Sequence, residues 1–172
     1  MYRMVFTRPD IAFATGKLSQ YLKEPADCHG TGLKGLLRYI GWTTNLQIHY
    51  GPTAKGHLTL YSDADWAGDR TDHKSTSGHV AMLYGGPISW GSRKQTSVAT
   101  SSTESEYIAM SSCAKQSQWI VQVLKDMGFP RYIGKHPYVA QIKGDNQGAL
   151  VLVKNPHLHE QSKHIDIQYH HI

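Results

Sequence analysis

Two aspartates in this 172-residue sequence lie at positions where a carboxylate could take part in ligand binding or catalysis. Asp63 ends the alternating segment HLTLYSD (57–63), and Asp145 ends a second apolar segment, YVAQIKGD (138–145). In sheets with helical crossovers, ligands usually bind at the carboxyl ends of the strands. An aspartate at such a position can equally cap the turn or helix that follows it. Two aspartates at matching strand ends favour a shared site.

A third carboxylate comes from a long segment with helical periodicity, in which Glu104 and Glu106 compete. Glu106 is in phase with four apolar residues: Ala109, Cys113, Ile120 and Leu124. These offsets trace one face of a helix, the face expected to pack on a sheet. Glu104 lies about 200° around the axis and is expected to point toward solvent. Both glutamates also fit a capping-box pattern, which is the favoured role for Glu104 and an alternative for Glu106.

The chemistry that suits Asp63, Glu106 and Asp145 is the binding of hard divalent cations. An unpaired charge on a packed helix face is costly, and a shared metal ion would supply a partner for it. Three carboxylates without a cysteine ligand favour Mg²⁺ or Mn²⁺ over zinc. Two such ions about 4 Å apart can activate a water and stabilise the leaving oxygen in phosphodiester hydrolysis.

The elements that must position these side chains predict an α/β fold. Residues 1–50 are expected to form two helices and a short strand over 46–50, and 51–56 a turn or linker. The rest is expected to contain strands over 57–63, 79–84 and 88–94, a helix over about 101–127, a strand over 138–145 and helical segments over 146–154 and 162–172. Three hairpin-linked strands followed by helix–strand crossovers predict a mixed sheet with helices packed on it.

Long motifs in the chain resemble a known family. Four of them are similar to the ribonuclease H region of copia-type retrotransposon Pol polyproteins: YSDADWAGD, KSTSGHVAMLYGGPISWGSRKQTSVATSSTESEYIAM, GDNQGAL and SKHIDIQYHHI. TRPDIAFATGKLSQYL and LKGLLRYI resemble the segment that joins reverse transcriptase to that region. The resemblance covers nearly the whole chain. It implies a C-terminal remnant of the reverse transcriptase region over 1–50 and a ribonuclease H-like domain over 56–172.

The resemblance also implies an activity. The family fold is a five-stranded mixed sheet with flanking helices, in which strands 1–3 are antiparallel. The activity is metal-dependent hydrolysis of the RNA strand of RNA–DNA hybrids, with two Mg²⁺ or Mn²⁺ ions. Asp63, Glu106 and Asp145 match the catalytic, metal-binding carboxylates of the family. The remainder of the Pol polyprotein is the implied protein partner.

Two further pairs of residues match positions at which the family contacts nucleic acid. Ser102 and Thr103 match side chains that contact the backbone at a helix N-terminus. Asn146 and Gln147 match residues that approach the minor groove, where a 2′-hydroxyl distinguishes RNA from DNA. Helix capping is an equally good interpretation of Asn146.

The sequence departs from the family pattern at its C-terminus. In the family, KHIDI…HHI begins a helix that leads to a fifth strand and a last helix with a fourth carboxylate, whereas this sequence ends at Ile172. Asp166 matches the earlier helix and not that fourth carboxylate. The chain is therefore expected to be truncated, to lack the fifth strand and last helix, and to have weak or no activity. The alternative function is an inactive remnant with at most weak nucleic-acid binding. Polymerase activity is not expected, because the polymerase palm is missing.

Composition narrows the classes further. Lys and Arg number 18 against 13 acids, a net charge of +5 that is compatible with a nucleic-acid partner. Two distant cysteines give no disulfide framework, and no apolar run reaches the roughly 20 residues of a membrane helix. An intracellular location follows, in the cytoplasm or alternatively the nucleus, with no membrane partner. The histidines of HLHEQSKH (157–164) leave a zinc-binding module as a third hypothesis, although their spacing matches no standard finger.

Overall fold

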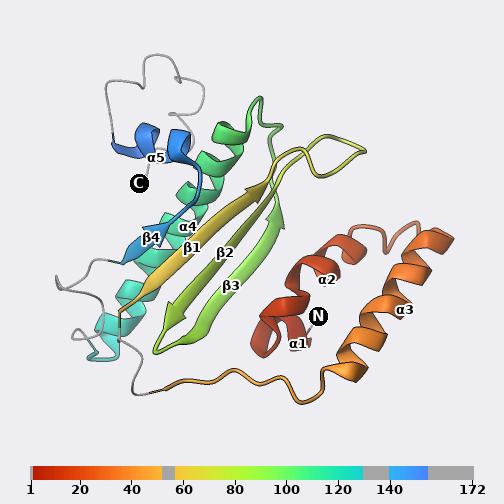
Figure 1. The fold of residues 1–172 in the computed structure, drawn as a ribbon, viewed down its shortest axis with the longest axis horizontal. Helices are drawn as coiled ribbons and strands as arrows, with labels where there is room; N and C mark the ends of the chain where they lie inside the picture. Colours follow the sequence, from red (N-terminus) through yellow and green to blue (C-terminus); the bar gives the residue numbers. More distant parts are fainter. Residues whose placement is uncertain (1, 52–56, 130–139, 155–172) are drawn as a thin grey trace.

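A mixed four-stranded sheet organises the protein (Figure 1). The computed structural model describes residues 2–51, 57–129 and 140–154. The strands are β1 (Thr59–Asp65), β2 (Thr76–Leu83), β3 (Gly86–Lys94) and β4 (Gln141–Lys143), in the order β3-β2-β1-β4. β1–β2 and β2–β3 pair antiparallel, whereas β1 and β4 pair parallel. The expected mixed α/β sheet is confirmed.

Helices lie against both faces of this sheet. α4 (Ser102–Asp126) contacts β1, β2 and β4, and α5 (Gln147–Lys154) packs beside α4. The N-terminal segment contains α1 (Tyr2–Phe6), a 3₁₀ turn η1 (Pro9–Ile11), α2 (Ala12–Ser19) and α3 (Asp27–Trp42). α2 contacts β3, and the indole nitrogen of Trp90 on β3 donates to the Met4 carbonyl at 2.7 Å. We call the sheet face on this side, opposite α4, the outer face.

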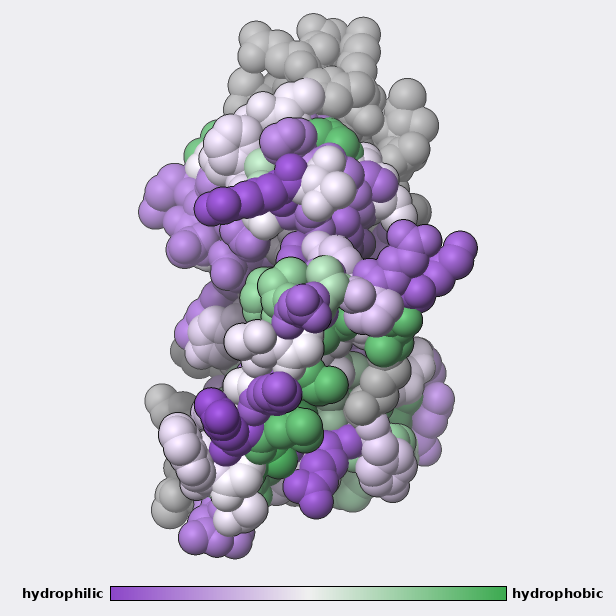
Figure 2. All heavy atoms as spheres, turned by 90° about the vertical axis from the view of Figure 1, so that its right-hand side faces the viewer, coloured by the Kyte–Doolittle hydropathy of each residue, from purple (hydrophilic) through white to green (hydrophobic). Residues whose placement is uncertain are grey.

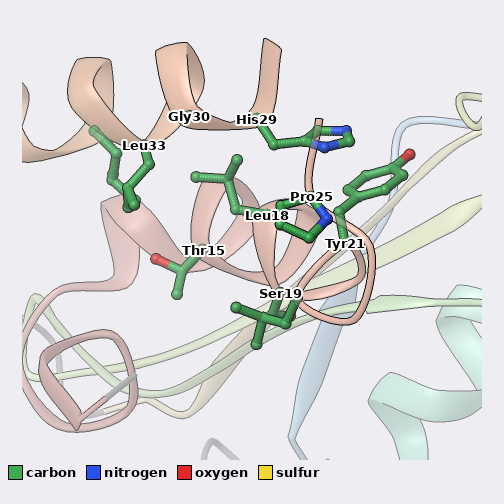
Figure 3. A pocket seen from close by; sticks show the side chains of 10 residues that line it. Thr15, Leu18, Ser19, Tyr21, Pro25, His29, Gly30 and Leu33 are labelled. Atoms are coloured by element: carbon green, nitrogen blue, oxygen red, sulfur yellow. The ribbon is translucent and has the colours of Figure 1, made fainter. Parts of the chain in front are cut away.

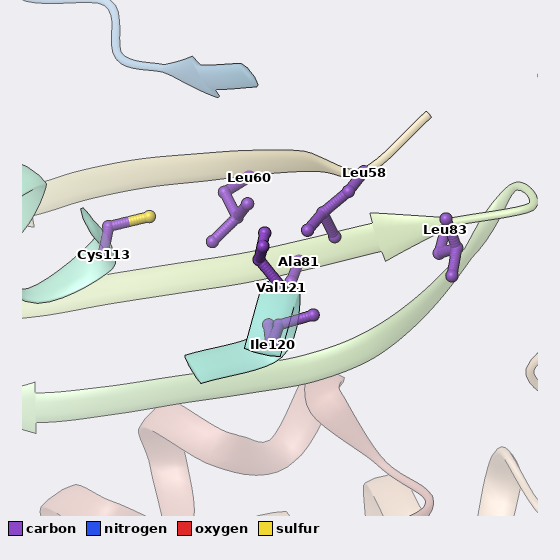
Figure 4. Packing of buried hydrophobic residues seen from close by; sticks show 7 residues of the cluster. All are labelled: Leu58, Leu60, Ala81, Leu83, Cys113, Ile120 and Val121. Atoms are coloured by element: carbon purple, nitrogen blue, oxygen red, sulfur yellow. The ribbon is translucent and has the colours of Figure 1, made fainter. Parts of the chain in front are cut away.

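The core lies between α4 and the inner face of the sheet (Figure 4). Alternation over 58–62, at the start of β1, directs Leu58, Leu60 and Ser62 toward α4, and all three are buried. Figure 4 shows the two leucines and two residues of β2 directed toward three apolar residues of α4. The full cluster is Leu58, Leu60, Ala81, Leu83, Cys113, Ile120 and Val121. The apolar stripe predicted for the long helix is thus the face that packs.

The β2–β3 hairpin closes through a two-residue turn at Tyr84 and Gly85. Both have positive φ, 52° and 80°, which suits the right-handed twist of the strands that they join. The strands expected over 79–84 and 88–94 leave 85–87 for the turn, but Leu83 pairs with Gly86, so β3 begins at Gly86.

The strand expected over 46–50 is wrong. These residues form no regular element, and they run toward the closed end of the hairpin instead of along a strand edge. There the Gly51 amide donates to the Tyr84 carbonyl at 3.0 Å, and the Tyr50 hydroxyl donates to the Pro87 carbonyl at 2.8 Å. The alternating apolar residues of 46–50 therefore pack here without the backbone hydrogen bonds of a strand pair. The helix expected over 162–172 and the histidines of 157–164 lie outside the described residues.

The two longer N-terminal helices line an open apolar pocket of about 280 Å³ (Figure 3). Leu18 of α2 and Leu33 of α3 line it, and the Tyr21 ring stacks on His29 with centroids 3.9 Å apart. α3 itself has no buried residue, and its Leu37 and Trp42 are exposed. Figure 2 views the molecule from this side, and hydrophobic side chains reach the surface there among polar ones.

An ionic junction at Asp69 joins the N-terminal segment to the sheet. Asp69 lies in the β1–β2 connection and is buried. Its Oδ2 atom accepts from Lys17 Nζ of α2 at 2.8 Å and from Lys94 Nζ of β3 at 2.7 Å, and Oδ1 accepts from the Thr71 amide at 2.9 Å. These hydrogen bonds, the one from Lys17 above all, hold the pKa of Asp69 well below its usual range.

Replacing Asp69 with asparagine is expected to lower the thermal midpoint at neutral pH by several degrees, because two lysines lose their common acceptor. A depressed pKa stabilises the fold above the unfolded-state value of 3.8 and stops doing so as the pH falls below it. The difference between variant and parent should therefore shrink in acid. Thermal unfolding at pH 7 and near pH 3 measures both effects. Asp72→Asn removes a single, partly exposed ion pair with Lys94, and an equal loss in that control would contradict the prediction.

Candidate metal centre

The parallel pairing of β1 with β4 brings two aspartates to the same level. The pairing ends at Tyr61 opposite Lys143, and Asp63 and Asp145 each follow two residues later. Asp63 lies inside β1, which continues to Asp65, and not at its end as expected. Beyond the last pair the backbones that follow these two positions diverge. In open α/β sheets, such a point is where a crevice forms.

A glycine before Asp145 lets the end of β4 approach α4. A Cβ atom at Gly144 would overlap the side chain of Met110 on α4. With hydrogen in its place, the chain passes directly over the helix, one residue before Asp145. The close approach therefore helps to carry the Asp145 carboxylate toward the residues of α4.

Glu106, in the second turn of α4, completes a cluster of three carboxylates. One oxygen from each of Asp63, Glu106 and Asp145 lies within 4.8 Å of the other two. Glu106 is buried, with 6% of its surface exposed, whereas the two aspartates are exposed to solvent. Two strands and one helix thus present acidic oxygens to a common point at the protein surface.

The environment of Glu106 disfavours its charge in the absence of a cation. Burial raises its pKa to about 7, and the neighbouring charges of Asp63 and Asp145 act in the same direction, against a hydrogen bond with the backbone of Ala64. Its buried Oε2 atom has no hydrogen-bond partner among the described residues. A buried acceptor without a partner is costly. A divalent cation between the three carboxylates would satisfy that oxygen and offset the repulsion, so the donor set fits a hard metal ion.

Glu104 is where the sequence interpretation partly fails. The predicted capping role of Glu104 is observed. Its amide donates to Ser101 Oγ at 3.1 Å. Its carboxylate accepts from the Thr100 amide and hydroxyl, each at 2.7 Å. Its expected solvent orientation is wrong, because only 8% of its surface is exposed. Thr100 folds back over the first turn of the helix, and helical phase carries no information about that connection.

The other four candidate residues lie at two neighbouring helix N-termini. Ser102 and Thr103 begin α4, and Gln147 begins α5. A Cβ atom at Gly148 would come within 3.0 Å of Thr103 Oγ1, so the first turns of the two helices touch. Asn146 caps α5, because its Oδ1 atom accepts from the Ala149 amide at 2.9 Å. Contact with nucleic acid remains a prediction for all four.

The junction at Asp69 escaped sequence reasoning. Its partners Lys17 and Lys94 lie 52 and 25 residues away in the chain, so no local pattern links them. Lys94 pairs with Asp72 as well as with Asp69. Within the described ranges, no helix is both long enough and apolar enough to cross a membrane.

The sheet and its acidic cluster define the class: an α/β protein with three convergent carboxylates where two parallel strands diverge. No family model matches the chain. It is 43% identical over 169 residues to the retrovirus-related Pol polyprotein from transposon RE2 of Arabidopsis thaliana, a match that covers 98% of this chain and 11% of that protein. The chain belongs to the family of retrovirus-related transposon Pol polyproteins, and it spans about a tenth of the length of that relative.

Two other similar proteins are not named as transposon Pol polyproteins. Secreted RxLR effector protein 161 of Plasmopara viticola is 46% identical over 120 residues, covering 70% of this chain and 84% of that protein. Among solved structures, LC11-RNase H1, isolated from compost, is similar with a TM-score of 0.42 and 17% identity, over 66% of this chain and 77% of that one.

Proposed function

We propose that this chain is the ribonuclease H-type part of a copia-type retrotransposon Pol protein and hydrolyses the RNA strand of RNA–DNA hybrids. In this proposal residues 1–50 come from the end of the reverse transcriptase region, and 56–172 form the nuclease domain. The observation that carries it is the convergence of Asp63, Glu106 and Asp145 within 4.8 Å. The similarity of nearly the whole chain to retrovirus-related Pol polyproteins from transposons supports it.

Asp63, Glu106 and Asp145 would hold two Mg²⁺ or Mn²⁺ ions. When bound, such ions supply an activated water and stabilise the leaving oxygen. Glu106 would bind through its buried oxygen, which has no other partner among the described residues. The two exposed aspartates would complete the site from the solvent side, where a phosphodiester can approach.

The neighbouring N-termini of α4 and α5 would position the hybrid. Helix N-termini favour anions, because their first amides lack partners and the helix dipole is positive there. Ser102 and Thr103 would contact the backbone of the hybrid. Gln147, which is exposed, and Asn146 would approach its minor groove, where the 2′-hydroxyl marks the RNA strand.

A cleavage assay tests the proposal. The chain is incubated with a hybrid labelled on its RNA strand, in Mg²⁺, in Mn²⁺ and in a chelator, beside single-stranded RNA and duplex DNA. We expect metal-dependent cuts in the RNA of the hybrid, at the weak level that the sequence predicts, and none in duplex DNA. Metal-independent cutting, or no cutting in either metal, would contradict the proposal. Binding of the hybrid without cutting would favour a non-catalytic nucleic-acid-binding domain.

A further inference from the structure

A groove crosses the outer face of the sheet, and Asp63 of the carboxylate cluster lines it. A cavity of about 340 Å³ lies between the sheet and the N-terminal segment, lined among others by Phe13, Asp63, Gly78 and Ser92. A second cavity of about 230 Å³ shares Phe13 and Ser92 with the first. The two cavities therefore adjoin beneath Phe13 of α2.

The strand register explains why the sheet is hollowed there. Asp63 pairs with Gly78, and Gly78 pairs with Ser92, so these three form one row across β1, β2 and β3. Gly78 has no side chain and Ser92 has a small one, which leaves the middle of the row low. Two taller rows flank it: Tyr61, Val80 and Trp90 on one side, and Asp65, Thr76 and Lys94 on the other. With strands about 4.8 Å apart, the low row spans about 10 Å.

We propose that this groove binds an unpaired strand of nucleic acid next to the point of cleavage. Two aromatic side chains stand over it with half of their surface exposed, Phe13 from α2 and Tyr61 from β1. Lys143 Nζ lies 5.5 Å from the centroid of the Tyr61 ring and puts a positive charge beside it. Aromatic platforms with nearby cations are how proteins hold single strands without reading their sequence.

The size of the groove and its continuity with the metal centre favour a single strand of nucleic acid as the molecule bound there. Asp63 belongs both to the carboxylate cluster and to the wall of the groove, so a strand lying in the groove passes beside one carboxylate of the cluster. Cavities of about 340 and 230 Å³ are too small for a duplex. The inference rests on the proposed nuclease function, and it gives the N-terminal segment a role in holding substrate through Phe13.

Binding measured without metal tests the groove separately from catalysis. The probe is a fluorescently labelled single-stranded RNA of about ten nucleotides, followed by anisotropy in a chelator. Phe13→Ala and Tyr61→Ala are each expected to weaken binding at least about fivefold, since stacking contributes about 1–3 kcal/mol per base.

Gly78→Val provides the sharpest variant, because it fills the low row and leaves every aromatic and acidic side chain in place. A Cβ atom at Gly78 meets nothing nearer than the Asp63 carbonyl at 3.9 Å, and valine favours strands, so the fold should be retained. Thermal unfolding checks this. Binding of the single strand is expected to fall about as far as in Phe13→Ala.

Trp119→Ala is the matched control, an aromatic residue 60% exposed on α4, across the sheet from the groove. It should leave binding unchanged. Retained binding in folded Gly78→Val and Phe13→Ala, or an equal loss in Trp119→Ala, would overturn the groove. If the chain cleaves hybrids but Gly78→Val does not change binding of the single strand, the groove proposal alone is overturned. Groove-dependent binding without any cleavage would overturn the nuclease proposal alone.

Discussion

Replacing Asp63 with asparagine is expected to reduce metal-dependent cleavage of a hybrid at least about 100-fold, because a direct metal ligand should cost no less than the outer-shell partners of such ligands. The amide keeps the shape of the side chain and removes its charge. Asp145→Asn should behave alike, since both carboxylates reach the same point. Initial rates at several Mg²⁺ concentrations, with isothermal titration of the metal, measure turnover and affinity together.

Asp126→Asn serves as the control for this experiment. Asp126 is exposed at the last residue of α4, far along the helix from Glu106, and it accepts a hydrogen bond from Gln122 of the same helix at 2.8 Å. The same substitution there should leave both rate and metal affinity unchanged. If Asp63→Asn kept the parental rate and affinity, the carboxylate cluster would have no part in the reaction.

Metal-free protein is expected to lose stability as the pH rises from about 4.5 to about 7, because Glu106 keeps its proton longer in the folded state than in the unfolded one. For an acid with a raised pKa, the unfolded state ionises first, so each step upward in this window favours unfolding. The expected loss is about 2 kcal/mol, less than the full shift implies because the cluster opens to solvent.

Glu106→Gln should remove this slope, since the amide cannot ionise. The variant is expected to be more stable than the parent at pH 8 in a chelator. Denaturant unfolding at intervals between pH 4 and pH 8 measures the effect. Mg²⁺ or Mn²⁺ should restore stability to the parent at pH 8 and have little effect on the variant, because metal binds the ionised form. Parallel slopes in the two proteins would show that Glu106 does not carry the effect.

Helical phase was informative for Glu106 and misleading for Glu104. The 3.6-residue repeat predicted which side of α4 packs on the sheet, and Glu106 is buried on that side. It predicted that Glu104 faces solvent, yet Thr100 covers Glu104 through two hydrogen bonds. A repeat describes one helix in isolation, and it cannot describe a connection that folds back over that helix.

The amino-acid sequence by itself determined the order of helices and strands over 57–154, the mixed character of the sheet and the residue types that could bind a metal. These depend on periodicity and turn chemistry, which act between residues close in the chain. The tertiary structure alone decided that Asp63 and Asp145 lie level, that Asp69 joins α2 to β3, and that Phe13 stands over the row at Gly78. Each depends on strand register or packing between distant segments, where many local choices must be satisfied at once.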